Sequence, residues 1–242
     1  MNTTDNIKSL FNSANPMTTE NSYEPSGICI GDTVLDNTPS GFALFQAIGG
    51  HYTSPAQAIE ELVDNAVSSI RANGGSGEVI LCLAAGGDCV DLSVCDSGTG
   101  ISDLGAALTI SGCGGAQTPL NEHGCGLKNA LSYLSEEDEL WLLESRTKED
   151  AAADRYRCVS APYAAIDRRM RARVHQGSGA ILFETGTTVR VRCGKEKLEC
   201  LKPATKRAKA DFRQLCGDLK EELAYTYAAI LAEGRITIGI IC

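Results

Sequence analysis

Apolar residues recur at steps of three and four between residues 55 and 72, which predicts an amphipathic helix. The apolar stripe consists of Ile59, Leu62, Val63, Ala66 and Ile70. Thr53 or Ser54 is expected to cap the start of this helix, and Pro55 suits its first turn. The sequence Asn-Gly-Gly at 73–75 is a typical end. The helix is therefore expected to bury one face and to present a polar one.

The rest of the chain reads mainly as strands. Residues 78–83 and 90–95 predict two strands, and the turn residues at 85–88 join them into a hairpin. Further strands are expected at 139–145, 155–159, 180–183, 188–192 and 235–241. Helices are expected at 126–134 and 210–233. Residues 103–125 are rich in Gly, Ser and Thr without clear periodicity, and a loop of that length is usually functional or disordered.

Composition narrows the class of protein. The chain has 242 residues, 43% hydrophobic and 22% charged, which is typical of a globular protein. The net charge of −9 excludes a uniformly basic surface that would coat nucleic acid. Two local basic clusters fit either a solvated surface or contacts with nucleic-acid phosphates: Arg168, Arg169, Arg171 and Arg173, and Lys202, Lys206, Arg207 and Lys209.

The first 27 residues are polar, without the apolar stretch of a secretory signal, and no apolar run is long enough to cross a membrane. We therefore expect a flexible lead-in over 1–27, no membrane association and an intracellular location, cytoplasmic or, in a eukaryote, nuclear. The eleven cysteines include no C-x-x-C pair, which favours reduced, buried thiols. A zinc site formed by Cys113, His123 and Cys125 is a weaker alternative.

Three segments carry candidate chemistry. Glu61 and Asn65 are four residues apart on the polar face of the first helix. A carboxylate and an amide oxygen suit Mg²⁺ and an attacking water, although a solvated helix face would show the same pair. The second segment is Asp-Ser-Gly-Thr-Gly at 96–100, directly after a strand. Its glycines allow a ligand to approach the backbone, and its aspartate can accept a hydrogen bond from an amino group.

The third segment, His-Gly-Cys-Gly-Leu-Lys-Asn-Ala at 123–130, leads from the long loop into a helix. Free backbone N–H groups and the positive end of a helix dipole suit a phosphate, and Lys128 adds a positive charge. Neither the Walker pattern nor the dinucleotide pattern G-x-G-x-x-G is present. Taken singly, each of the last two segments also fits an ordinary turn.

In this order, the three segments resemble the GHKL ATPase superfamily, which includes gyrase-type topoisomerases, heat-shock chaperones, histidine kinases, MutL and MORC proteins. Residues 61–66, Glu-Leu-Val-Asp-Asn-Ala, are most similar to the MORC and MutL versions. The resemblance covers residues 45–195. It implies the Bergerat fold, an α/β (α+β) sandwich with a mixed, mostly antiparallel sheet covered on one face by helices. The implied division is an ATP-binding domain at 28–195, then at 196–242 a connector, a helix and the start of a transducer-like second domain.

The resemblance also implies a role for each matching residue. Glu61 is the expected catalytic base and Asn65 the Mg²⁺ ligand. Asp96 is expected to bind the adenine amino group. The remaining cofactor-binding positions are Gly98, Gly100 and Ile101 around the base, Gly124, Gly126 and Lys128 at the phosphates, and Thr187 closing the adenine pocket.

The implied function is Mg²⁺-dependent ATP binding and hydrolysis that drives a conformational switch and homodimerisation, with a nucleic-acid or protein client. A second hypothesis is an ATP-sensing module with little hydrolysis. It is favoured because Ser68-Ser69 stand where the family often has Asp-Ala, and because the lid at 103–123 lacks a Ser-Lys or Thr-Lys element. The absence of a phosphoacceptor-histidine helix argues against a third, a GHKL protein kinase.

Overall fold

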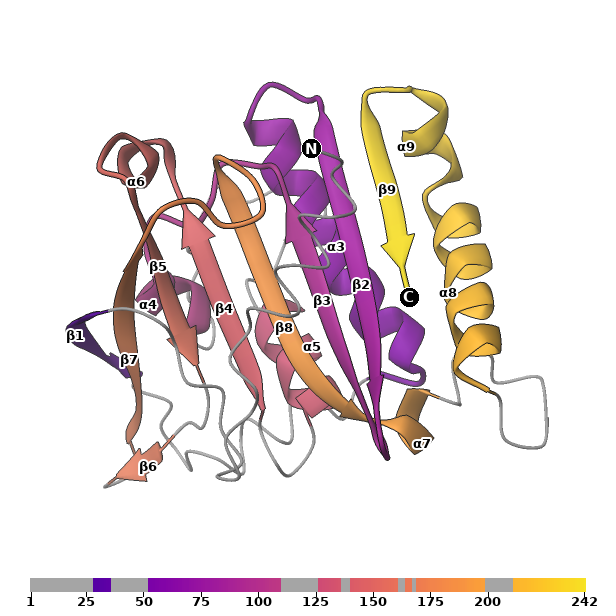
Figure 1. The fold of residues 1–242 in the computed structure, drawn as a ribbon, viewed down its shortest axis with the longest axis horizontal. Coiled ribbons are helices and arrows are strands. Elements are labelled where there is room, and N and C mark those ends of the chain that lie inside the picture. The colour runs from indigo at the N-terminus through magenta and orange to yellow at the C-terminus, as the bar shows by residue number, and fades with distance from the viewer. Residues whose placement is uncertain are drawn as a thin grey trace.

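The computed structural model describes residues 28–35, 52–109, 126–135, 140–160, 164–166, 169–198 and 211–242. Nine strands form one sheet in the order β1-β7-β5-β4-β8-β3-β2-β9, with β6 paired to β7 (Figure 1). The strands are β1 (Ile28–Leu35), β2 (Gly77–Gly86), β3 (Cys89–Asp96), β4 (Trp141–Arg146), β5 (Arg155–Ser160), β6 (Ala164–Ile166), β7 (Arg169–Ser178), β8 (Gly186–Gly194) and β9 (Ile236–Ile241).

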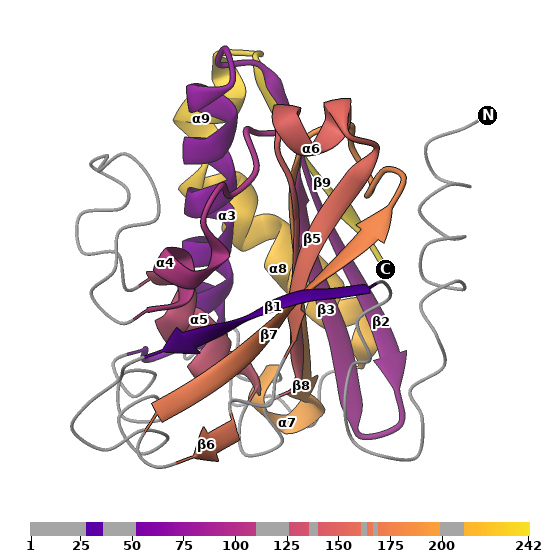
Figure 2. The ribbon, with the colours of Figure 1, turned by 90° about the vertical axis from the view of Figure 1, so that its left-hand side faces the viewer.

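The expected fold class is confirmed. Neighbouring strands are antiparallel, except that β9 runs parallel to β2. Figure 2 shows three helices on the same face of the sheet: α3 (Pro55–Ala72), α4 (Leu104–Leu108) and α5 (Gly126–Ser135). The other helices are α6 (Lys148–Ala152), α7 (Lys195–Leu198), α8 (Phe212–Thr226) and α9 (Ala228–Ala232). Within the described ranges, no helix is both long enough and apolar enough to cross a bilayer.

Helix α3 forms as the sequence predicts. The Ser54 hydroxyl caps it by accepting a hydrogen bond from the Gln57 N–H, and the helix ends at Asn73. Its apolar stripe is fully covered by the sheet and by α5, and Ile59, Val63 and Ile70 have no exposed surface. Each such side chain contributes roughly 1.5–3 kcal/mol of hydrophobic stabilisation. This burial fixes which face of α3 remains available for a site.

The hairpin of β2 and β3 is confirmed, and so are strands near 155–159, 188–192 and 235–241. The strand expected at 180–183 is wrong, because these residues form irregular backbone and a bend between β7 and β8. Leu182 and Phe183 instead pack against Ile80 and Cys82. Strands β1 and β7 were not predicted, since the arginine-rich sequence of β7 hides the alternation that a strand would show.

The last 32 residues join the same sheet and core. Strand β9 pairs with β2 from Gly77↔Ile236 to Cys82↔Ile241. The predicted helix at 210–233 is two helices, α8 and α9, that meet at Tyr227. Leu215, Leu219 and Leu223 of α8 belong to the main core. Residues 211–242 thus form one edge of the sheet and part of the main core.

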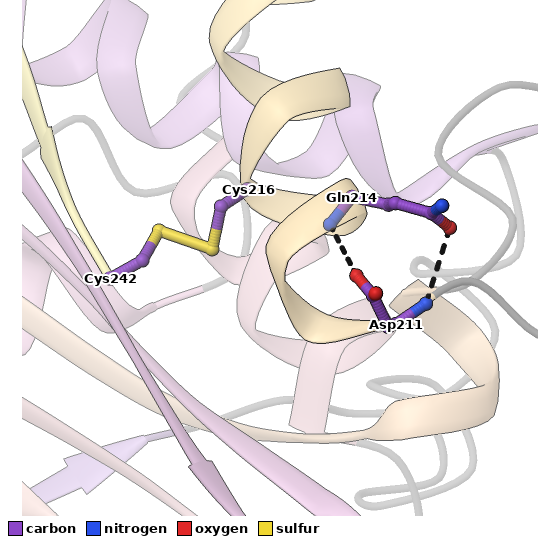
Figure 3. Close-up of a disulfide and its surroundings, with 4 residues drawn as sticks. All are labelled: Asp211, Gln214, Cys216 and Cys242. Atoms are coloured by element: carbon purple, nitrogen blue, oxygen red, sulfur yellow. Dashed lines mark hydrogen bonds between the residues drawn. A yellow bond between two sulfur atoms is a disulfide. The ribbon is translucent and has the colours of Figure 1, made fainter.

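Two cysteines correct the expectation of reduced thiols. Cys216 of α8 and Cys242 after β9 form a disulfide with a Cα–Cα distance of 6.5 Å (Figure 3). The same view shows the capping box of α8, in which the Gln214 N–H donates to the Asp211 carboxylate at 2.8 Å. Cys82, Cys95, Cys158 and Cys193 are buried thiols outside any disulfide, as predicted. Burial raises the pKa of the Cys95 thiol to about 12, so this thiol stays neutral.

Several expectations lie outside the described residues. They concern the lead-in at 1–27, the loop residues 110–125 with Gly124 and the zinc candidates, and the basic cluster at 202–209. Of the other basic cluster, Arg168 lies outside and Arg173 is an exposed residue of β7.

Candidate functional site

The polar face of α3 carries Glu61, Asn65 and Ser69, one residue per turn, all half-buried. The Asn65 Nδ2 donates to the Glu61 carbonyl oxygen at 2.8 Å. This bond orients the side-chain amide and leaves its oxygen as the acceptor for a ligand. These three residues form a polar stripe, distinct from the apolar stripe, that presents a carboxylate, an amide oxygen and a hydroxyl along one line.

The start of α5 lies against the Glu61 end of this stripe. A Cβ atom built on Gly126 would fall 1.6 Å from Glu61 Oε1, so any side chain there would displace the Glu61 carboxylate. The structure therefore brings the first and third candidate segments together. Burial, and then the charge of Asp64, raises the pKa of Glu61, which makes its carboxylate a stronger proton acceptor.

The other end of the stripe reaches Asp96, the last residue of β3 and only 5% exposed. One carboxylate oxygen accepts a hydrogen bond from the Gly98 N–H at 2.8 Å. Hydrogen bonding from the Ser69 hydroxyl and the Thr187 backbone N–H also acts to lower the pKa of this carboxylate. A carboxylate has about four acceptor positions, so three donors leave room for one more. Burial raises its pKa to about 7.

The loop after Asp96 is held by side chains rather than by a strand ladder. The Thr99 N–H donates to the Ser69 hydroxyl at 3.1 Å. The Thr185 hydroxyl donates to the Gly98 carbonyl at 2.8 Å, and the Asn73 amide donates to the same carbonyl at 3.1 Å. The backbone of the second candidate segment therefore has a defined position beside α3.

The far end of this loop is fixed as well. Gly100 has a φ of +71°, and a Cβ there would lie 2.5 Å from the Arg146 carbonyl oxygen, so glycine is required. The Ile101 N–H donates to the Ser145 hydroxyl at 2.6 Å. The Ile101 side chain packs against the main core.

Lys128 is placed differently from the other candidates. It is 1% exposed, and its Nζ donates to the Thr109 carbonyl oxygen at 2.6 Å. This bond connects α5 to Thr109, the residue that follows α4. The structure thus brings Glu61, Asn65 and Gly126 together at one end of the polar stripe. It brings Asp96, Gly98 and Thr187 together at the other end. Lys128 instead bonds to Thr109, after α4.

The residues that the sequence did not assign to the site are hydrogen-bonding supports. They are Ser69, Asn73, Ser145 and Thr185, each of which bonds to Asp96 or to the loop at 97–101. Ser69 was noticed only as a departure from the family pattern. The other three are ordinary polar residues whose partners lie 24 to 112 positions away along the chain, so no local signal marks them.

The oxygen donors along α3 can be compared with the ligands that Mg²⁺ prefers. Within the described parts of the chain, no cluster of three or more His, Cys, Asp or Glu side chains could hold a metal by itself. Mg²⁺ commonly binds through one or two protein oxygens and completes its shell with water and phosphate oxygens. The side-chain oxygen of Asn65 is one oxygen of this kind.

Comparison of the chain with models of known protein families and with curated protein sequences gave no match.

Proposed function

We propose that this chain binds ATP with Mg²⁺ along the polar face of α3 and hydrolyses it. The observation that carries the proposal is the placement of two different groups at the two ends of the polar stripe: the buried Asp96 carboxylate at one end, and Glu61 beside Gly126 at the other. Ser69, which bonds to Asp96, lies eight residues after Glu61, which faces Gly126. Eight residues of α-helix span about 12 Å. That length is comparable with the separation of base and terminal phosphate in an extended nucleotide.

Each residue then has a defined task. The vacant acceptor position of Asp96 receives the hydrogen of the adenine amino group, while Gly98, Gly100 and Ile101 border the base. The glycine backbone at the start of α5 offers N–H groups to phosphate oxygens. Asn65 would hold Mg²⁺, which supplies positive charge to the phosphates when bound. Glu61 accepts the proton of the attacking water.

A second candidate, an ATP-sensing module with little turnover, is favoured by specific observations. Ser68 and Ser69 supply no carboxylate at the family's Asp-Ala position. The ammonium of Lys128 is bonded to the Thr109 carbonyl. Both features reduce the charge available to the phosphates without weakening recognition of the base.

A pair of measurements separates these candidates: calorimetric titration with Mg-ATP and the rate of phosphate release, for the wild type and Glu61→Ala. We expect Glu61→Ala to bind ATP with little change and to lose hydrolysis by roughly 10²–10⁴-fold. Glu78→Ala, which removes an exposed glutamate of β2, is the matched control and should keep both properties. Binding without turnover in the wild type selects the sensor, and no binding rejects both.

The wider role is part of the same proposal. By resemblance to GHKL proteins, nucleotide binding would favour a homodimer that acts on a nucleic-acid or protein client. The expected intracellular location also belongs here, and the Cys216–Cys242 bridge argues against it, because disulfides are rare in reducing compartments.

A further inference from the structure

Arg157 of β5 extends its guanidinium across to the loop that follows Asp96. Its Nη1 donates to the Ser102 carbonyl at 2.7 Å, and its Nη2 donates to the Ile101 carbonyl at 2.9 Å. Both acceptors come directly after Gly100. One side chain therefore holds two successive peptide units where the loop leaves the base end of the site.

A buried carboxylate fixes the direction of this guanidinium. Asp150 of α6 has a side chain that is 2% exposed, and its Oδ2 accepts bonds from Arg157 Nε at 3.0 Å and Nη2 at 2.8 Å. The N–H and hydroxyl of Thr147 bond to the same oxygen. Burial acts to raise the pKa of Asp150, but the bonds from Arg157 and Thr147 outweigh it, so the pKa lies below its usual value. Asp150 is thus a charged, immobile anchor.

A purely stabilising role does not account for this arrangement. A buried ion pair gives little net stability, because desolvation of the two charges offsets their attraction. The planar fork of an arginine instead provides directional bonding. Here the fork is directed at a segment between β3 and α4 that lacks a strand ladder, so side chains must set its geometry.

Arg155 on the same strand provides a comparison inside the molecule. Its Nε bonds to the other oxygen of Asp150 at 3.0 Å, and its side chain is 40% exposed, against 17% for Arg157. The two arginines share one anchor, but Arg157 is the one bonded to the Ile101 and Ser102 carbonyls.

We infer that Arg157 is a positioning residue for base specificity, holding the 97–102 backbone so that Asp96 and its glycines select a 6-aminopurine. This inference rests on the proposed nucleotide site and adds its specificity. A base with an oxygen at position 6 lacks the amino hydrogen that the Asp96 carboxylate accepts from adenine, so correct loop geometry favours ATP over inosine triphosphate. Displacement of the loop should weaken that preference.

The test compares the dissociation constants of Mg-ATP and Mg-inosine triphosphate for the wild type, Arg157→Met and Arg155→Met. We expect Arg157→Met to reduce the preference for ATP by about tenfold, the effect of one charge-assisted hydrogen-bonding contact. We expect Arg155→Met to leave the ratio within about twofold. A general loss of folded protein would weaken both ligands equally and would not change the ratio.

Arg157→Lys keeps the charge but not the fork, and it covers the case in which the methionine variant does not fold. It should lower the preference in the same direction. Faster amide exchange of Ile101 in the Arg157 variants than in Arg155→Met is the matching structural result. An unchanged ratio in the Arg157 variants, or an equal change in Arg155→Met, overturns the positioning role. Failure of the wild type to bind ATP overturns the proposed function itself.

Discussion

Asp96 is a carboxylate that the fold buries among three neutral donors: the Gly98 N–H, the Ser69 hydroxyl and the Thr187 N–H. Burial raises its pKa to about 7, so about half of the unliganded protein carries the charged form at neutral pH. A group held this far from its usual ionisation is often functional. Its proton should therefore compete with an amino group of a ligand.

We expect ATP affinity to rise with pH across neutrality. The ionised Asp96 carboxylate is a stronger acceptor for the adenine amino hydrogen than the protonated acid, and protonation below about pH 7 removes its charge and occupies one acceptor position. The dissociation constant at pH 6 should be about tenfold higher than at pH 8. Calorimetry at pH 6, 7 and 8 measures this change.

Inosine triphosphate is the control for this titration, because it has the same phosphates but no amino group at position 6. The ratio of the two dissociation constants removes ionisation of the phosphates themselves. A ratio that does not change between pH 6 and pH 8 would contradict the role of the Asp96 carboxylate.

At the scale of the element, α3 divides its surface between two tasks. Its apolar stripe packs on the sheet, while Glu61 and Asn65 remain half-buried beside α5. The periodicity of the stripe and the cap at Ser54 made this helix and its polar face predictable. The contact with α5 was not predictable, since it depends on a glycine 65 positions further along the chain.

Gly126→Ala tests the close approach of α5 to α3. The added methyl group would lie 1.6 Å from Glu61 Oε1, so the carboxylate or the helix must move. We expect hydrolysis to fall at least tenfold and the free energy of unfolding to drop by about 1–3 kcal/mol. Steady-state kinetics and urea unfolding provide the two readouts.

Gly217→Ala is the matched substitution. Gly217 lies within α8, and a Cβ there meets no atom within 4 Å. Alanine should stabilise that helix by roughly 0.5–1 kcal/mol and leave hydrolysis unchanged. If the two variants behave alike, the contact between Gly126 and Glu61 has no functional importance.

At the scale of the whole molecule, strand β9 forms one edge of the sheet by pairing with β2. The strand near 235–241 was predictable from its β-branched residues, but its partner, β2, lies some 160 positions earlier. Local sequence patterns do not show which distant segments pair. For the same reason, the disulfide could not be predicted from the sequence. Strand β7 was not predictable either, because its sequence lacks hydrophobic alternation. It forms through its pairing with β1 and β5.

The Cys216–Cys242 bridge should stabilise this edge of the sheet. A bridge with a sequence separation of 26 residues restricts the unfolded chain by about 3 kcal/mol in the loop-entropy description. We expect Cys242→Ser to lower the free energy of unfolding by about that amount in urea titration without reductant. Cys89→Ser, at a half-buried free cysteine, should cost less than about 1 kcal/mol. Equal stability of the wild type with and without a dithiol reductant would show that the bridge does not form.

The central claim is that a purine base binds at Asp96. Calorimetric titration of Asp96→Ala with Mg-ATP tests it, with Asp91→Ala as the control on the same strand, where the side chain pairs with Arg192 at 2.7 Å. We expect Asp96→Ala to weaken ATP binding by ten- to a hundredfold, through the loss of a desolvated, charge-assisted hydrogen bond. Asp91→Ala should stay within about twofold of the wild type. Equal ATP affinity in Asp96→Ala and the wild type would contradict the claim.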